Sequence, residues 1–130
     1  MPLAEELITG RNSIQAYQSD LITINEKNYH QSLILSASQI ISPWPVTHID
    51  ELKLDHLQAI IDQKPEVILL GTGDKQQFPD IEIIGYFAQL GLGLEVMNTG
   101  AACRTFNILV AEDRHVVAAL ILDSEVERSY

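Results

Sequence analysis

The chain has 130 residues, of which 46% are hydrophobic and 20% are charged, and its 18 acidic residues outnumber its 8 Lys and Arg residues to give a formal net charge of -10. This length and composition predict one soluble globular domain that spans residues 1–130. The basic residues are scattered singly along the chain, so the sequence argues against nucleic acid and anionic membrane surfaces as partners.

Membrane spans, cofactors and metals find little support in the sequence. No apolar run approaches the roughly 20 residues that cross a bilayer, and the first residues are acidic, so we expect a cytoplasmic protein without direct membrane insertion. Cys103 is the sole cysteine, which excludes an internal disulfide. The four histidines are dispersed along the chain, and we therefore expect neither a metal site nor a bound cofactor.

The first third of the chain predicts strands. Short segments with β-branched residues lie around residues 14–16 and 21–24, and a polar turn at 25–28 precedes a further segment at 29–35. Two prolines in Ser42-Pro43-Trp44-Pro45 then break the chain, and Trp44 is better suited to a buried anchor than to an exposed contact. These segments predict a hairpin or meander that either joins the main sheet or adds a layer to it.

The rest of the chain alternates between helices and strands. Apolar residues at helical spacing predict a first helix that ends before Pro65. The strands that follow are continuous apolar runs, which are typical of a sheet covered on both faces. We therefore predict an α/β fold, with strands at 67–70, 94–97 and 116–122 and with helices from Pro79 to about Leu90 and from Thr99 to about Glu112.

The loops that follow the first two of these strands are expected to leave the same edge of the sheet, where α/β proteins collect ligands. The first loop contains Gly71-Thr72-Gly73-Asp74, which resembles part of a phosphate-binding loop. However, Gln76 stands where the Walker and the dinucleotide-binding motifs both require glycine, and two acidic residues begin the next helix. We therefore predict a structural turn with a positive φ at Gly71 or Gly73.

The second loop is the better candidate for a pocket. Asn98 or Thr99 caps a helix whose first turn holds only small residues, and Arg104 follows. Free backbone N–H groups beside a guanidinium favour an anion seat, whereas the alternative is a capped helix that packs tightly on the sheet. The candidate ligand or anion pocket comprises Gly71, Thr72, Gly73, Asp74, Asn98, Thr99, Gly100, Cys103 and Arg104.

Cys103 can be interpreted in two ways. Its position near the start of a helix would lower the pKa of its thiol and favour a reactive thiolate. Its spacing with Phe106 and Val110, however, is that of a buried stripe, and free cysteine is among the most buried residue types. We predict that Cys103 packs in the core.

The helix that follows Pro79 is apolar on two faces, which is more than a surface helix needs to bury. Ile81, Ile84 and Ala88 lie on one face. The other face carries Ile83, Phe87 and Leu90, which we predict as the partner-binding surface.

The segments "VILLGTGD" (residues 67–74) and "LEVMNTGAACRTFNILVAEDRHVVAALIL" (residues 94–122) resemble, in their motifs and spacing, a small α/β family of unknown biochemical function. This family includes a mitochondrial assembly factor of respiratory complex I and an adipogenesis-associated domain protein. The upstream pattern with Ser32-Leu33 and Pro43-Trp44-Pro45 also fits. The resemblance implies a single three-layer domain around a mixed β-sheet, with N-terminal β-strands followed by alternating helix and strand. It also implies an assembly or accessory role, and it transfers no catalytic residue.

These observations favour a non-enzymatic accessory or assembly-type module that binds protein partners, linked to a membrane or respiratory complex. The alternative is a small-molecule or anion-binding enzyme with its site at the Gly71–Asp74 and Asn98–Arg104 loops. A homo-oligomer with a structural role is a third interpretation. A filled loop edge beside an exposed apolar patch would favour the first interpretation, and a well-formed polar pocket would favour the second.

Overall fold

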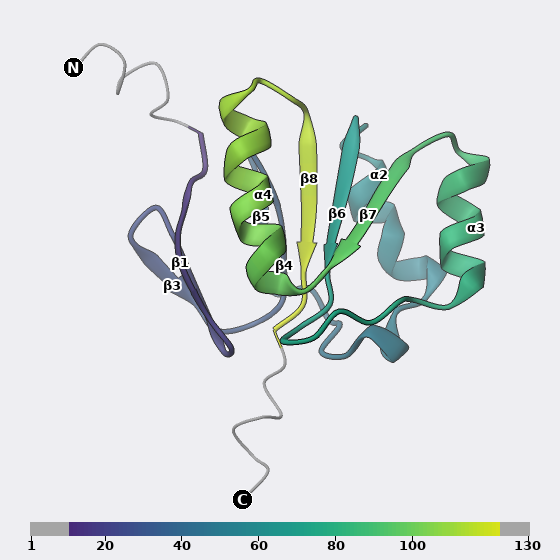
Figure 1. The fold of residues 1–130 in the computed structure, drawn as a ribbon, viewed down its shortest axis with the longest axis horizontal. Coiled ribbons are helices and arrows are strands. Elements are labelled where there is room, and N and C mark those ends of the chain that lie inside the picture. The colour runs from purple at the N-terminus through teal and green to yellow at the C-terminus, as the bar shows by residue number, and fades with distance from the viewer. Residues whose placement is uncertain (1–10, 123–130) are drawn as a thin grey trace, which may run out of the picture.

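The computed structural model describes residues 11–122, which form a three-stranded and a five-stranded β-sheet together with helices (Figure 1). The three-stranded sheet is an antiparallel meander of β1 (Ile14–Gln18), β2 (Leu21–Ile24) and β3 (Lys27–Tyr29). Asn25 and Glu26 alone connect β2 to β3, with φ of 53° and 69°. Left-handed backbone at both positions is what a two-residue hairpin requires. The predicted turn at 25–28 is therefore too long, because residues 27 and 28 already pair in β3.

The five-stranded sheet has the order β5-β4-β8-β6-β7. Its central strand β8 pairs in parallel with β6 and antiparallel with β4, so the sheet is mixed, as predicted. The N-terminal strands follow both predicted routes, since β4 and β5 join this sheet whereas β1 to β3 add a layer. The bounds are β4 (Leu33–Ser36), β5 (Ile40–Ile41), β6 (Val67–Gly71), β7 (Gly93–Met97) and β8 (Val116–Leu120).

The helices lie close to the predicted ranges, with one shift. The structure places Asp80 at the N-cap of α3, so this helix begins two residues after Pro79 rather than at it. A single helix was predicted from Leu54, where the structure has the 3-10 turn η2 followed by α2, and a further 3-10 turn, η1, precedes them. The bounds are η1 (Ile49–Glu51), η2 (Leu54–Leu57), α2 (Gln58–Ile61), α3 (Ile81–Gln89) and α4 (Thr99–Ala111).

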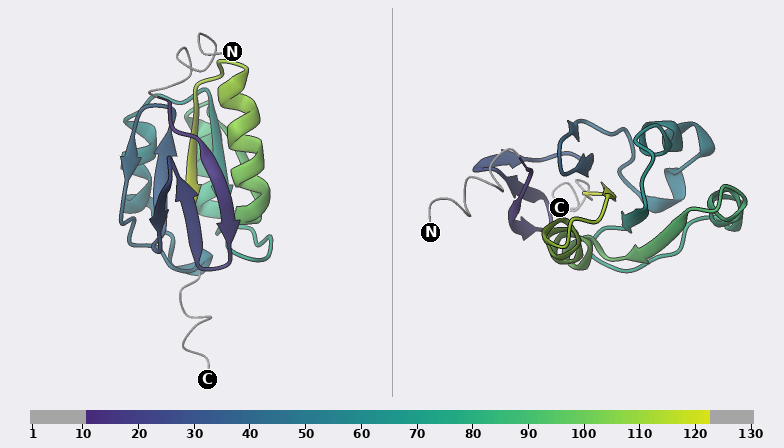
Figure 2. Two further views of the ribbon diagram at one scale, coloured as in Figure 1. Left: turned by 90° about the vertical axis from the view of Figure 1, so that its left-hand side faces the viewer. Right: turned by 90° about the horizontal axis from the view of Figure 1, so that it is seen from above.

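Alternating residues of the central strands face two separate cores, because successive side chains of a strand point to opposite faces. In β8, Ala118 and Leu120 pack with α4 and the three-stranded sheet. Val117 and Ala119 pack with α2 and α3 on the other face. Figures 1 and 2 show this arrangement, with the three-stranded sheet beside α4 and with α2 and α4 on opposite sides of the central strands. The five-stranded sheet is therefore the middle of three layers, and the predicted fold class is confirmed.

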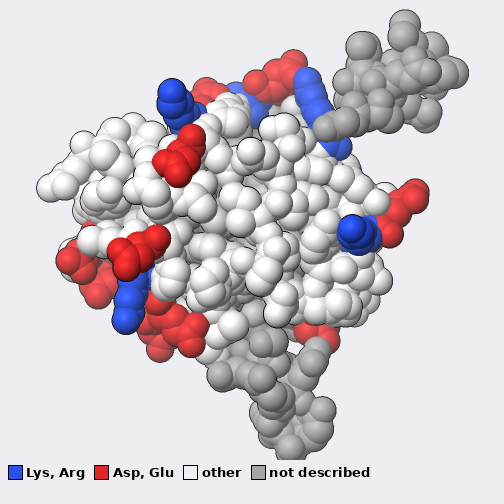
Figure 3. Space-filling view, turned by 180° about the vertical axis from the view of Figure 1, so that it is seen from behind, with Lys and Arg blue, Asp and Glu red and all other residues white. Residues whose placement is uncertain are grey.

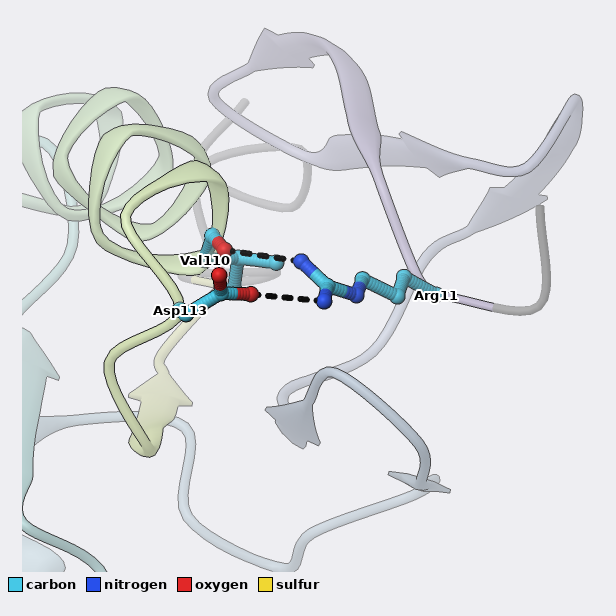
Figure 4. Close-up of polar contacts among 3 residues, drawn as sticks. All are labelled: Arg11, Val110 and Asp113. Carbon is cyan, nitrogen blue, oxygen red and sulfur yellow. Dashed lines mark hydrogen bonds and ion pairs between the residues drawn. The ribbon is translucent and has the colours of Figure 1, made fainter. Parts of the chain in front are cut away.

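Two side chains anchor irregular segments to these layers. Trp44 is buried, and its indole nitrogen donates a hydrogen bond to the carbonyl oxygen of His56 at 3.2 Å, as expected of an anchor. Arg11 reaches the C-terminal end of α4, where its guanidinium donates to the carbonyl oxygen of Val110 at 3.1 Å and to the carboxylate of Asp113 at 2.6 Å (Figure 4). A cation is stabilising at this end of a helix, so Arg11 ties the chain before β1 to α4.

Candidate functional site

The parallel strands β6 and β7 bring the two predicted loops together. Gly71, the last residue of β6, pairs with Met97 of β7 on one side and with Leu120 of β8 on the other. The loop that begins at Thr72 and the start of α4 at Thr99 therefore leave the same edge of the sheet. The sequence-based expectation that the two loops are neighbours agrees with this register.

Thr99 occupies the space between the two loops. Its side-chain oxygen accepts a hydrogen bond from the backbone N–H of Gly73 at 2.8 Å and donates one to the carbonyl oxygen of Ile121 at 2.8 Å. Its own backbone N–H donates to the carbonyl oxygen of Gly73 at 2.8 Å. The side chain is fully buried. Thr99 thus joins the first loop, the start of α4 and the chain after β8.

The two glycines of the first loop serve different purposes. Gly73 has a φ of 101°, which confirms the predicted left-handed turn, because L side chains rarely adopt this conformation. Gly71 has no positive φ, yet a Cβ atom there would lie 2.9 Å from the Thr99 side-chain oxygen and 3.0 Å from the Thr99 Cα. Gly71 is therefore needed for close approach of β6 to α4, and the glycine pattern reflects packing.

The N-terminus of α4 is also engaged within the protein. The Asn98 side chain caps the helix by accepting a hydrogen bond from the N–H of Ala101 at 2.8 Å. The ring of Tyr17 from β1 covers Gly100, because a Cβ on that glycine would lie 3.2 Å from two ring carbons. The Tyr17 hydroxyl donates to the carboxylate of Asp74 at 3.0 Å. The anion-seat hypothesis is weakened, since a carboxylate and an aromatic ring lie where an anion would approach.

Cys103 is buried with 3% of its surface exposed, as the helical spacing predicted. Burial raises the pKa of its thiol to about 12, and the nearby Arg104 guanidinium lowers that pKa only in part. A thiol with this pKa stays protonated at neutral pH, and the thiolate is the nucleophilic form. The environment of Cys103 therefore opposes a nucleophilic role.

A shallow hollow of about 320 Å³ remains between β1 and α4, and three residues of the candidate pocket, Gly100, Cys103 and Arg104, line it. Asn107 forms one wall and clamps β1 with two hydrogen bonds, accepting from the N–H of Ile14 at 3.0 Å and donating to its carbonyl oxygen at 2.7 Å. Arg104 is exposed at the same hollow. The lining residues are Ile14, Gln15, Ala16, Tyr17, Gly100, Cys103, Arg104 and Asn107.

A second hollow of about 320 Å³ lies on the other side of the first loop, between that loop and residues 47–49. Thr72 lines it, but its hydroxyl already donates to the carbonyl oxygen of Lys75 at 2.6 Å and accepts from the N–H of Gln77 at 3.1 Å. These bonds hold the turn after β6 in shape. Thr72 is therefore a turn residue in this structure, whereas Asp74 and Lys75 place opposite charges along the hollow.

The predicted partner surface requires a correction. Ile83 and Phe87 are 2% and 1% exposed, because they point into the core between α3 and the sheet. Leu90 is exposed but lies beyond the last residue of α3. The other face of the helix is the open one, with Ile81 81% exposed and Ile84 37% exposed. Phe78, 68% exposed, precedes this helix, and we call Phe78, Ile81 and Ile84 the α3 surface.

Residues 11–122 offer neither a membrane-spanning helix nor a metal-binding cluster. No helix in this part of the chain is long and apolar enough to cross a membrane. Within the same residues, no group of three or more His, Cys, Asp or Glu side chains is arranged to hold a metal ion.

Sequence reasoning missed the side chains that join β1 to the loop edge and to α4. Tyr17 and Asn107 contact the start of α4 and β1 respectively, and each bridges segments far apart in the chain. The asparagine and threonine before α4 signalled a capped helix, but nothing local signalled that Thr99 would bond Gly73 and Ile121.

Comparison with known proteins identifies the family. Residues 14–121 match the family model described as protein of unknown function (DUF498/DUF598). The chain belongs to this family. The resemblance found from the two loop motifs is therefore confirmed.

Relatives and solved structures agree with this assignment. A Francisella tularensis protein named "13 kDa major membrane protein" is 37% identical over 122 residues, which cover 93% of this chain and 99% of that protein. Human NADH dehydrogenase (ubiquinone) 1 alpha subcomplex assembly factor 3 is 36% identical over 110 residues, which cover 83% of this chain and 59% of that protein. The match thus spans less than two thirds of the assembly factor. An NMR structure of a Xanthomonas campestris protein is 36% identical with a TM-score of 0.81, covering 95% of this chain and 94% of that one.

Proposed function

We propose that this protein is a non-enzymatic accessory module that binds protein partners and acts in the assembly of a membrane or respiratory complex. The family relationship supports an assembly role, because a relative that matches 83% of this chain is named an assembly factor of NADH dehydrogenase. The observation that carries the proposal is the exposed α3 surface. Large apolar side chains that cluster in the open are typical of protein-binding sites.

The geometry of the α3 surface supports this role. Ile81 and Ile84 are three residues apart on one helix, so their side chains lie on the same face. Ala88 continues that face and is also exposed. Phe78 precedes the helix and adds an exposed aromatic ring, a residue type enriched at interfaces. A partner that covers these side chains would remove apolar area from water, which is favourable.

The alternative, a small-molecule or anion-binding enzyme at the two loops, receives less support. The loop edge is filled by Thr99, and the start of α4 is covered by Tyr17. Asp74 adds a negative charge at the same place. The exposed guanidinium of Arg104 at the hollow beside α4 is the feature that keeps this alternative open.

Affinity capture from the native organism tests the proposal with three forms of the chain. We expect the wild-type protein to retain a defined partner and Ile81→Asp to lose it, because a carboxylate in the apolar contact must be desolvated. Ile108→Asp is the matched control, since Ile108 is 57% exposed on α4. Equal capture by all three forms would contradict the assignment of binding to the α3 surface. Recovery of only a second copy of this chain would favour the homo-oligomer.

A cytoplasmic location is part of the proposal. The formal net charge of -10 would repel an anionic membrane surface, which favours residence in solution. Cell fractionation with the native chain tests this expectation. Recovery in the membrane fraction after a high-salt wash would contradict it and would agree with the name of the Francisella relative.

A further inference from the structure

The first turn of α3 borders a hollow of about 460 Å³ that is lined by both apolar and charged residues. Leu52 and Ile83 form its buried part, and Leu54, 40% exposed, lines it from η2. Ile81 of the α3 surface lies in sequence between two residues that line the hollow, Asp80 and Glu82. The α3 surface and this hollow therefore meet at the start of one helix. We call the hollow the acidic groove, and its lining is Asp50, Leu52, Lys53, Leu54, Asp55, Asp80, Glu82 and Ile83.

The charges around the acidic groove are mostly negative and are not paired within the described chain. Four of its lining residues are acidic, and Lys53 is the single basic one. Among residues 11–122, none of these four carboxylates makes a hydrogen bond or an ion pair, and Asp80 does not use its side chain to cap α3. Figure 3 shows acidic side chains gathered at the lower left, where α3 begins, beside a centre that carries no charged side chain.

The spacing of the carboxylates selects the kind of cation. No group of three acidic or histidine side chains in the described residues converges closely enough to hold a metal ion. The four acidic residues instead line the hollow together with three apolar residues, which are Leu52, Leu54 and Ile83. Such an arrangement suits a ligand that carries several separate cationic groups, with apolar groups between them. Lysine and arginine side chains interleaved with leucine-like side chains provide this combination.

We propose that the acidic groove and the adjoining α3 surface bind a cationic amphipathic segment of a partner protein, in which Lys or Arg residues alternate with apolar ones. This inference rests on the proposed protein-binding function and names the chemistry of its partner. The apolar residues of the segment contact Leu54 and Ile81, and its basic residues pair with the surrounding carboxylates. The charge complementarity speeds and orients the encounter, whereas apolar burial supplies the larger share of affinity.

The test uses the full chain and defined probes. A short synthetic peptide of lysine, leucine and alanine is titrated by calorimetry, beside a peptide with glutamate in place of lysine and beside spermine. The groove variant is Asp55→Asn/Asp80→Asn/Glu82→Gln. The control variant, Glu26→Gln/Glu95→Gln/Glu112→Gln, changes the net charge equally at exposed positions outside the groove. A third variant, Leu54→Ser, removes an apolar contact and leaves the charge unchanged.

We expect the lysine peptide to bind and its Kd to rise about tenfold in the groove variant and by less than about twofold in the control variant. Leu54→Ser should also weaken binding of the lysine peptide. Equal weakening in the two charge variants would reduce the effect to net charge and overturn the proposal. The proposal is also overturned if the glutamate peptide binds as tightly as the lysine peptide. The same holds if spermine binds as tightly as the lysine peptide and Leu54→Ser has no effect.

The outcome also separates this inference from the proposed function. If binding of a native partner depends on Ile81 but the lysine peptide neither binds the chain nor competes with that partner, the proposed cationic segment is contradicted. The proposed accessory function is then still supported. If the peptide binds in the groove but no native partner is captured, the groove chemistry stands while the accessory function fails.

Discussion

Replacing Thr99 with valine should strongly destabilise the fold, because the hydroxyl bridges two buried backbone groups. Valine keeps the shape of threonine but leaves the Gly73 N–H and the Ile121 carbonyl without this partner. A buried polar group without a partner costs about 1–3 kcal/mol, so the two together should lower the free energy of unfolding by roughly 2–6 kcal/mol. This is a large part of the roughly 5–15 kcal/mol by which domains of this size are stable.

Thr99→Ser is the matched control, because serine keeps the hydroxyl and removes one methyl group, at a cost of about 1 kcal/mol. Urea titrations followed by fluorescence of the single tryptophan, Trp44, measure both variants, since this residue is 4% exposed and reports on the core. We expect Thr99→Val to unfold at clearly lower urea than Thr99→Ser. Equal midpoints would refute the reasoning, since the hydroxyl would then not be holding the two loops together.

Three further predictions concern the same fold. Gly71→Ala and Gly73→Ala should each lower the free energy of unfolding by more than about 1 kcal/mol. The new Cβ at position 71 clashes with Thr99, and the positive φ at position 73 strains alanine. An unchanged urea midpoint for either variant would contradict this. Cys103 should react slowly with a maleimide in the native state and quickly in denaturant, because burial raises the pKa of its thiol to about 12. Fast labelling of the native protein, with a rate that titrates below pH 7, would overturn the packing role of Cys103. Glu51 and Glu66 have a folded pKa below the ordinary 4.5, chiefly through hydrogen bonds from backbone N–H groups, so they stabilise the fold above that pH and stop doing so as the pH falls through the lowered pKa. The Glu51→Gln/Glu66→Gln variant should therefore lose less stability between pH 7 and pH 3 than the wild type, and parallel curves would count against these two groups.

The strands of the main sheet were predictable because burial on both faces leaves a direct mark on the sequence. Continuous apolar runs at β6 and β8 have no amphipathic alternation, and the structure buries both of their faces. The order of the strands was not predictable in the same way. It depends on β4 entering beside β8 through antiparallel pairing, which joins segments about 80 residues apart and leaves no local signal.

The correction at α3 has a physical cause. Both faces of this helix are apolar, so periodicity alone cannot decide which face is buried. The packing of Ile83 and Phe87 against the sheet decides it, and that packing depends on the position of β6 and β7. Ile81 and Ile84 are left exposed as a consequence. The sequence therefore predicted the wrong face of this helix as exposed.

The sequence predicted that the two loops are neighbours, but it did not predict the side chains that lie between them. The register of β6 and β7 makes the two loops neighbours, as expected when two consecutive strands pair in parallel. Whether such an edge is open depends on side chains that arrive from elsewhere. Tyr17 comes from β1 and Ile121 follows β8, and no pattern within the loops announces either contact.

Photo-crosslinking in the native organism tests the central claim, binding of a protein partner at the α3 surface, most directly. A photoreactive residue is placed at position 81 in one form of the chain and at position 108 in another, since Ile81 and Ile108 are both exposed and lie on different helices. We predict a discrete covalent adduct with another protein from position 81 and none from position 108. Adducts of equal yield from both positions, or none from position 81, would contradict the account.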